Sequence, residues 1–235
     1  MHGPVHNLAA LAVCFCLTVL AGCAQTGGSS PGMFASFSRK KTPEELLHIK
    51  TPDDRIKELR ELTKTAKKKT PEEQQRIVGD LVKQIEQESE PRMRRQILRT
   101  LGAYPQPGAT AVIVAGLTDG DVETRRVACA SLGTRGGKEA VQELTRVAAS
   151  DTNLDVRLAA VRAMGHTHDS SALAPLTDAL GDADPAMQAR AHASLAAVSG
   201  RDFGNDAKAW RDYAATVKAE DPPVSWAERL RRVFY

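Results

Sequence analysis

Few side chains in this sequence have the type and spacing that chemistry requires. The best metal candidate is the run His166-Thr167-His168-Asp169, because imidazole and carboxylate groups are common ligands of transition metals. The run follows Gly165, between two segments with helical periodicity, so the ordinary composition of a turn explains it equally well. We find no glycine-rich phosphate loop and no zinc-type spacing of cysteine and histidine. We therefore expect no catalytic residue, no metal and no cofactor.

At one position that a sequence repeat brings into register, an arginine follows an acid by six residues in three copies. A guanidinium can bind a carboxylate through two parallel hydrogen bonds, so each such pair predicts an ion pair, Arg125 with Asp119 for example. A fourth acid, Asp182, stands six residues before Gln188 and lacks a charged partner. The predicted pairs are Glu88 with Arg94, Asp119 with Arg125, and Asp151 with Arg157.

These pairs belong to a repeat of 31 or 32 residues. Four segments align: EPRMRRQILRTLG from 90, DVETRRVACASLG from 121, NLDVRLAAVRAMG from 153 and DPAMQARAHASLA from 184. Each predicts a helix, and a glycine at the aligned end of three of them predicts where the helix stops. Shorter apolar helices are expected from 109, 138 and 171. A fixed period of this length is typical of stacked helical repeats.

The aligned segments resemble the HEAT repeat, in the short bacterial form also seen in phycobilin lyases. The resemblance implies an all-α α-solenoid of about four helix pairs over residues 71–198. In that family the acid lies in the turn between the two helices of a pair and the arginine begins the second helix. The two form a hydrogen-bonded ladder that runs from repeat to repeat, so Arg125 could also pair with a neighbouring repeat. HEAT arrays are general binding surfaces, so the fold by itself says little about function.

A second set of arginines is not needed for such a ladder. In the family, the second helices of the pairs line the concave face. One side of these helices carries six arginines against two acids, Glu123 and Asp155. A solvated helix face explains this charge, and a groove for an acidic protein segment or an anionic envelope polymer is the functional alternative. The candidate partner-binding residues are Arg92, Arg95, Arg99, Arg126, Arg162 and Arg190. The net charge of +3 is too small to indicate nucleic acid.

The N-terminal segment predicts export and lipid anchoring. Residues 8–20 are an apolar run too short to cross a bilayer but typical of a secretory signal. The following Leu20-Ala21-Gly22-Cys23 resembles the lipobox of bacterial lipoproteins, in which the cysteine is acylated. We expect a signal peptide over 1–22, lipidated Cys23, and a flexible tether over 23–41. The resemblance implies the bacterial cell envelope, and Ala24 favours the outer membrane, facing the periplasm. The remaining thiol, Cys129, is expected to be buried among small apolar residues.

Both flanks of the repeat array are expected to be helical. Thr-Pro-acid starts at 42, 51 and 70 predict capped helices, which places N-terminal helices over 42–70. Residues 199–235 hold most of the aromatic side chains and predict a helical cap, with one helix carrying Trp210 and Tyr213 and another after Ser225. His192 takes an apolar position of its repeat and is expected to be packed.

The sequence therefore predicts a membrane-tethered, non-catalytic protein-binding or scaffold module of the cell envelope. Two alternatives stay open: a lyase-like enzyme related to the HEAT-type chromophore lyases, and a structural subunit of a larger envelope complex.

Overall fold

The computed structural model describes residues 50–220. The expected signal peptide, Cys23, the tether, the helix start at 42 and the helix after Ser225 lie outside the described residues. Among the described helices, none combines the length and the apolar character that crossing a membrane requires.

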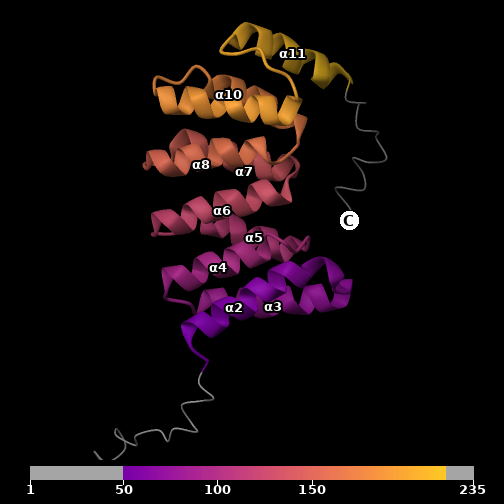
Figure 1. Ribbon diagram of the computed structural model, residues 1–235, viewed down its shortest axis with the longest axis vertical. Coiled ribbons are helices and arrows are strands. Elements are labelled where there is room, and N and C mark those ends of the chain that lie inside the picture. The colour runs from indigo at the N-terminus through magenta and orange to yellow at the C-terminus, as the bar shows by residue number, and fades with distance from the viewer. Residues whose placement is uncertain (1–49, 221–235) are drawn as a thin grey trace, which may run out of the picture. The chain divides into compact units, whose positions relative to one another are not determined.

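The described chain is entirely helical, as the sequence predicted, with no strand in residues 50–220. Figure 1 shows the helices stacked in chain order, from indigo at α2 to yellow at α11. Their bounds are α2 (Pro52–Thr65), η1 (Ala66–Lys68), α3 (Pro71–Glu86), α4 (Pro91–Leu101), α5 (Pro107–Gly116), α6 (Val122–Arg135), α7 (Gly137–Ser150), α8 (Leu154–Gly165), η2 (Ser170–Ala172), α9 (Leu173–Ala179), α10 (Pro185–Ser199) and α11 (Ala207–Glu220).

The helices form two layers. In the first layer, α2, α4, α6, α8 and α10 contact one another in that order. In the second layer, α3 contacts α5, α7 contacts η2, and α11 contacts both α9 and η2. The consecutive pairs α3–α4, α5–α6, α7–α8 and α9–α10 also pack together. These four pairs cover the range expected for the array, with α2 before them and α11 after them.

Local signals set the helix starts. Thr51 and Thr70 each form a complete capping box with the acid three residues later, Asp54 and Glu73, and a proline follows each cap. These caps satisfy backbone N–H groups that the first turn leaves without partners. Both predicted helix starts are confirmed.

Two of the three aligned glycines stand where their helix stops, as the sequence predicted: Gly102 is the C-cap of α4 and Gly165 is the last residue of α8. The prediction is wrong for the third. Gly133 lies inside α6, which ends at Arg135 and is followed by Gly136 with a φ of 69°. A Cβ at Gly133 would lie 2.7 Å from the carbonyl oxygen of Ala163 on α8, and one at Gly165 would lie 2.9 Å from Ser194 on α10. These glycines therefore let neighbouring first-layer helices approach closely, and they do not form left-handed helix ends.

The core between the layers is built from aliphatic side chains. Ile97, Leu132 and Leu144 are fully buried. Cys129 is also fully buried, and burial raises the pKa of its thiol to about 12. The expected burial of Cys129 is confirmed.

An aromatic helix closes the C-terminal side of the described array. The Asp206 carboxylate accepts from the backbone N–H groups of Lys208 and Ala209, which starts α11. Trp210 is fully buried, donates its indole N–H to the carbonyl of Gly204 at 2.9 Å, and lies edge-on to Phe203. The predicted helix with Trp210 is confirmed, and it packs on α9 and η2.

Candidate binding surface

The half-buried arginines join one repeat to the next. Nε and Nη2 of Arg94 donate to the two carboxylate oxygens of Asp119, both at 2.8 Å. Arg125 binds Asp151 in the same way, at 2.8 and 3.1 Å. We call these bonds the arginine ladder. Each of these arginines pairs with the acid of the following repeat. The expected side-chain pairings of Glu88 with Arg94, Asp119 with Arg125 and Asp151 with Arg157 are therefore wrong.

The acid six residues earlier contributes its backbone to the same arginine. Nη1 of Arg125 donates to the carbonyl oxygen of Asp119 at 2.9 Å. The Asp119 carboxylate is turned away from Arg125, since it accepts from the backbone N–H of Asp121 at 2.8 Å as well as from Arg94. The constant spacing therefore reflects a carbonyl contact inside each repeat, and the ion pair bridges two repeats.

The ladder has a defined beginning and end within the described residues. It starts with Arg55 on α2, which donates to Glu88 at 2.9 Å. Arg157 donates to the carbonyl of Asp151 at 2.9 Å but forms no ion pair with Asp182. Gln188 keeps the backbone bond alone, donating to the carbonyl of Asp182 at 2.7 Å. Bridging ion pairs therefore connect α2 to the α7–α8 turn and are absent between α8 and the α9–α10 turn.

The electrostatics favour the charged form of the ladder acids. Burial would raise the pKa of Asp119, but hydrogen bonds from Arg94 and from the Asp121 N–H outweigh it and lower the pKa below the usual range. Asp151 has a lowered pKa by the same balance, with Arg125 and the Asn153 N–H as donors. Both acids are therefore ionised ladder members at neutral pH.

Three of the six candidate partner-binding arginines are engaged by this chain. Arg92 pairs with Asp53 at 2.8 Å, and Arg95 pairs with Asp121 at 2.9 Å. Arg126 pairs with Glu123 on its own helix. The positive charge of this side is therefore more neutralised than the sequence suggested, because Asp53 and Asp121 come from positions distant in the sequence.

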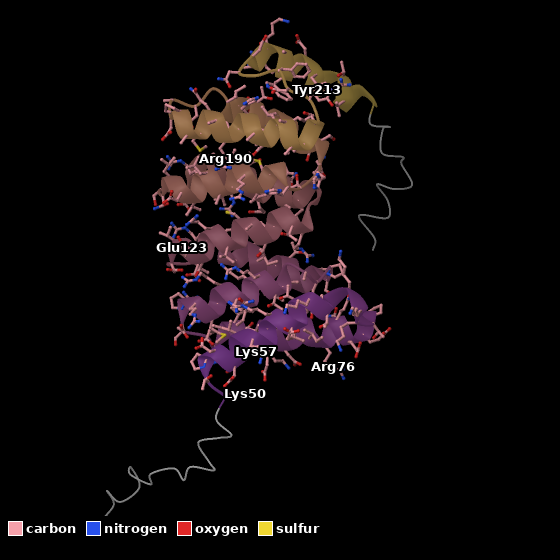
Figure 2. All side chains as sticks on the ribbon, viewed as in Figure 1. Lys50, Lys57, Arg76, Glu123, Arg190 and Tyr213 are labelled. Atoms are coloured by element: carbon pink, nitrogen blue, oxygen red, sulfur yellow. The ribbon has the colours of Figure 1, made fainter. Side chains whose placement is uncertain are left out.

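The other three, Arg99, Arg162 and Arg190, are exposed and form no ion pair with any residue in the range 50–217. Figure 2 labels Arg190 on α10 and Glu123 on α6. Sequence reasoning missed a fourth arginine of this kind, Arg60 on α2, which is also exposed and has no ion pair among the described residues. An alignment of α2 with the later helices at their N-caps would have found it, because Arg60 stands as far after Thr51 as Arg99 stands after Glu90.

Arg60 and Arg99 lie on either side of one helix contact. The Thr100 hydroxyl on α4 donates to the carbonyl of Leu59 on α2 at 3.1 Å. Arg99 precedes Thr100 and Arg60 follows Leu59, so the two arginines lie on adjacent turns of α4 and α2. Burial, together with the charges of Arg95 and Arg60, lowers the pKa of Arg99 from its usual value. Positive charge is thus concentrated where α2 meets α4.

The histidine candidates lie in the turn that follows α8. His166 and His168 are exposed, and the Asp169 carboxylate accepts from the backbone N–H of Ser171 at 2.9 Å. In the described part of the chain, no group of three or more histidine, cysteine or acidic residues is arranged to hold a metal ion. His192 is half-buried and bonds through Nε2 to Asp202 at 2.8 Å, so it is a polar contact as well as a packed side chain.

A cavity of about 620 Å³ lies where α4 and α6 end, lined by Tyr104, Arg135 and Lys138 among others. Arg135 is committed to the turn before α5: it donates to the carbonyl oxygens of Tyr104 and Pro105 and to the Thr110 hydroxyl. It therefore serves as a structural link in the wall of this cavity.

Comparison with known proteins identifies the fold. No curated protein matches the sequence. A solved structure of the complex of CpcE and CpcF of phycocyanin lyase from Nostoc is similar with a TM-score of 0.50 and 19% identity, over 88% of this chain and 79% of that chain. Human deoxyhypusine hydroxylase in complex with glycerol is similar with a TM-score of 0.48 and 24% identity, over 53% of this chain and 44% of that chain. This chain thus spans less than half of the hydroxylase.

The sequence itself matches the family of HEAT repeats over residues 78–163 and 147–210, which together make up more than half of the chain. The two matches include α4 through α10 and reach Trp210 in α11. The stacked helix pairs and the repeated arginine ladder agree with this match. The chain belongs to the HEAT repeat family.

Proposed function

We propose that this HEAT-repeat protein is a non-catalytic binding or scaffold module, tethered to a membrane of the bacterial envelope through lipid at Cys23. The observation that carries the proposal is the division of its arginines. The half-buried ones hold the repeats together, whereas exposed ones on the first layer include several without an ion pair in the described chain. Exposed arginines without an ion pair add little to the stability of the fold and are available to a partner.

The tether is supported by the order of the N-terminal segments. An apolar run, the Leu20-Ala21-Gly22-Cys23 tetrapeptide and a Gly- and Ser-rich stretch follow one another. Buried acyl chains at Cys23 would anchor the chain at about 0.8 kcal/mol for each CH₂. A flexible linker of this length spans roughly 20 to 25 Å, which would keep the array close to the membrane surface. Ala24 favours the outer membrane, facing the periplasm.

A structural role in a larger complex is the second proposal. The similar structure from Nostoc is a complex of two proteins, CpcE and CpcF. A permanent complex would yield a partner in constant stoichiometry that resists high salt, whereas a partner bound through exposed arginines would be released as salt rises.

The anchor is tested with Cys23→Ser and, as the matched control, Cys16→Ser inside the apolar run. We expect metabolic labelling with a fatty acid to mark the wild type and Cys16→Ser, and Cys23→Ser to accumulate as unlabelled precursor. The array lies downstream of both sites, so its helical content should be unchanged by circular dichroism. Equal fatty-acid label on wild type and Cys23→Ser would refute the tether.

A further inference from the structure

The candidate arginines of the first layer differ in whether this chain pairs them. Arg92, Arg95 and Arg126 bind acids of this chain, and Arg190 on α10 is exposed without an ion pair among the described residues. Three others stand nine residues after the cap of α2, α4 and α8, and they form no ion pair with a described residue. We name Arg60, Arg99 and Arg162 the arginine row.

Resting on the binding function proposed above, we propose that the arginine row binds an acidic segment of a partner protein, laid in extended form across α2, α4, α6 and α8. Each guanidinium would bind a carboxylate through two hydrogen bonds.

The row residues lie on helices that, with α6 between α4 and α8, are neighbours in the first layer. The Thr100–Leu59 hydrogen bond joins α4 to α2 beside Arg99 and Arg60. On α6, the position that corresponds to the row is Ala130, which is exposed and too short to obstruct the path between Arg99 and Arg162. The path therefore crosses four successive helices of the first layer.

The spacing sets the length of the segment. Packed helix axes lie about 10 Å apart, so the row extends over roughly 30 Å. An extended chain advances about 3.3 Å per residue, so about ten residues cover the row. Carboxylates about three residues apart would meet Arg60 and Arg99, and a third about six residues further would meet Arg162.

The charge around Arg99 favours an incoming carboxylate. Burial and the charges of Arg95 and Arg60 lower the pKa of Arg99, which the nearby Glu123 offsets only in part, and no described acid forms an ion pair with Arg99. A carboxylate at this point would relieve the repulsion between like charges while making charge-assisted hydrogen bonds.

Acids on the same layer argue for a protein segment over a uniform polyanion. Glu123 on α6 and Asp155 on α8 stand two residues after their caps and are exposed. Residues seven apart share one side of a helix, so Asp155 and Arg162 face the same partner. A polymer with a negative charge on every unit would be repelled there, whereas a protein segment can place neutral or basic residues opposite these acids.

The test uses two fluorescent ten-residue peptides and the full chain in neutral detergent. One peptide carries Glu at positions 1, 4 and 10 among uncharged residues, and the other carries Lys at those positions. Binding is measured by fluorescence anisotropy. The variant Arg99→Glu with Arg162→Glu removes two members of the row. The matched control, Arg76→Glu with Arg211→Glu, makes the same charge change on exposed second-layer residues of α3 and α11.

We expect the wild type to bind the Glu peptide, more weakly as salt rises. The row variant should bind it about tenfold more weakly or worse and should gain affinity for the Lys peptide. The control variant should bind like the wild type, and thermal melts should show all three proteins folded alike.

Equal loss of affinity in the control variant, or no gain for the Lys peptide, would overturn the proposal. Inorganic polyphosphate and vesicles of anionic lipid form two further arms. If the wild type binds either of these but not the Glu peptide, the choice of a protein partner is overturned. The proposed function of a tethered binding module is not affected by that result, because its tests are the fatty-acid label on Cys23 and the recovery of a partner.

Discussion

Two adjacent residues show how burial divides the arginines. The side chain of Arg125 is 14% exposed and holds Asp151 of the next repeat, whereas that of Arg126 is 43% exposed and pairs with Glu123 on its own helix. The sequence separates the two correctly, because an acid precedes only Arg125 by the repeated spacing of six. The spacing pointed to Asp119, because a spacing within one repeat carries no information about which carboxylate the next repeat presents. Only the resemblance to HEAT repeats implied a contact with a neighbouring repeat, and it did not single out Asp151.

The ladder predicts unequal costs for substitutions at equivalent positions. Arg125→Ala removes a bidentate ion pair and leaves the half-buried Asp151 carboxylate without its charged partner, which should lower the free energy of unfolding by about 3 kcal/mol. Gln188→Ala removes a single hydrogen bond to a carbonyl and should cost about 1 kcal/mol. Denaturant unfolding of both variants measures the difference. A cost for Gln188→Ala as large as that for Arg125→Ala would contradict the assigned ladder.

Helix starts and helix contacts differ in how far they can be predicted. The starts at Thr51 and Thr70 follow from local capping chemistry, so the sequence contains the whole signal. Gly133 carries no such signal, because its role depends on how closely α8 approaches α6. A glycine near the end of an apolar pattern suggests a helix end, and the structure shows that a close helix contact leaves the same sequence pattern.

The close contact predicts opposite effects for two glycine substitutions within helices. Gly133→Ala would place a Cβ against the backbone of Ala163 and should destabilise the protein by about 1 to 3 kcal/mol. Gly79→Ala on α3 meets no atom within 4 Å and should stabilise it by about 0.5 to 1 kcal/mol, because alanine favours the helix. Thermal melts of the two variants show whether each substitution raises or lowers the melting temperature. An unchanged melting temperature for Gly133→Ala would show that α6 and α8 are not in close contact there.

The whole molecule follows from its repeat period. Four aligned segments predicted the helix pairs that α3 through α10 form, because a period of this length leaves few other ways to bury the apolar faces. The surface charge was harder to predict. Arg92 and Arg95 are paired with acids 39 and 26 residues away, from neighbouring helices of the first layer. Only the stacked arrangement shows which arginines are left for a partner.

The central claim is that the first layer of this array holds a partner through its arginine row. Site-specific photo-crosslinking in intact cells tests it most directly, with Ala130→p-benzoylphenylalanine on the path of the row and Gln142→p-benzoylphenylalanine on the exposed side of α7 in the second layer. We predict a discrete crosslinked product from position 130, absent from position 142 and lost when Arg99→Glu and Arg162→Glu are added. Equal products from both positions, or a product at 130 that survives the two arginine substitutions, would contradict the account.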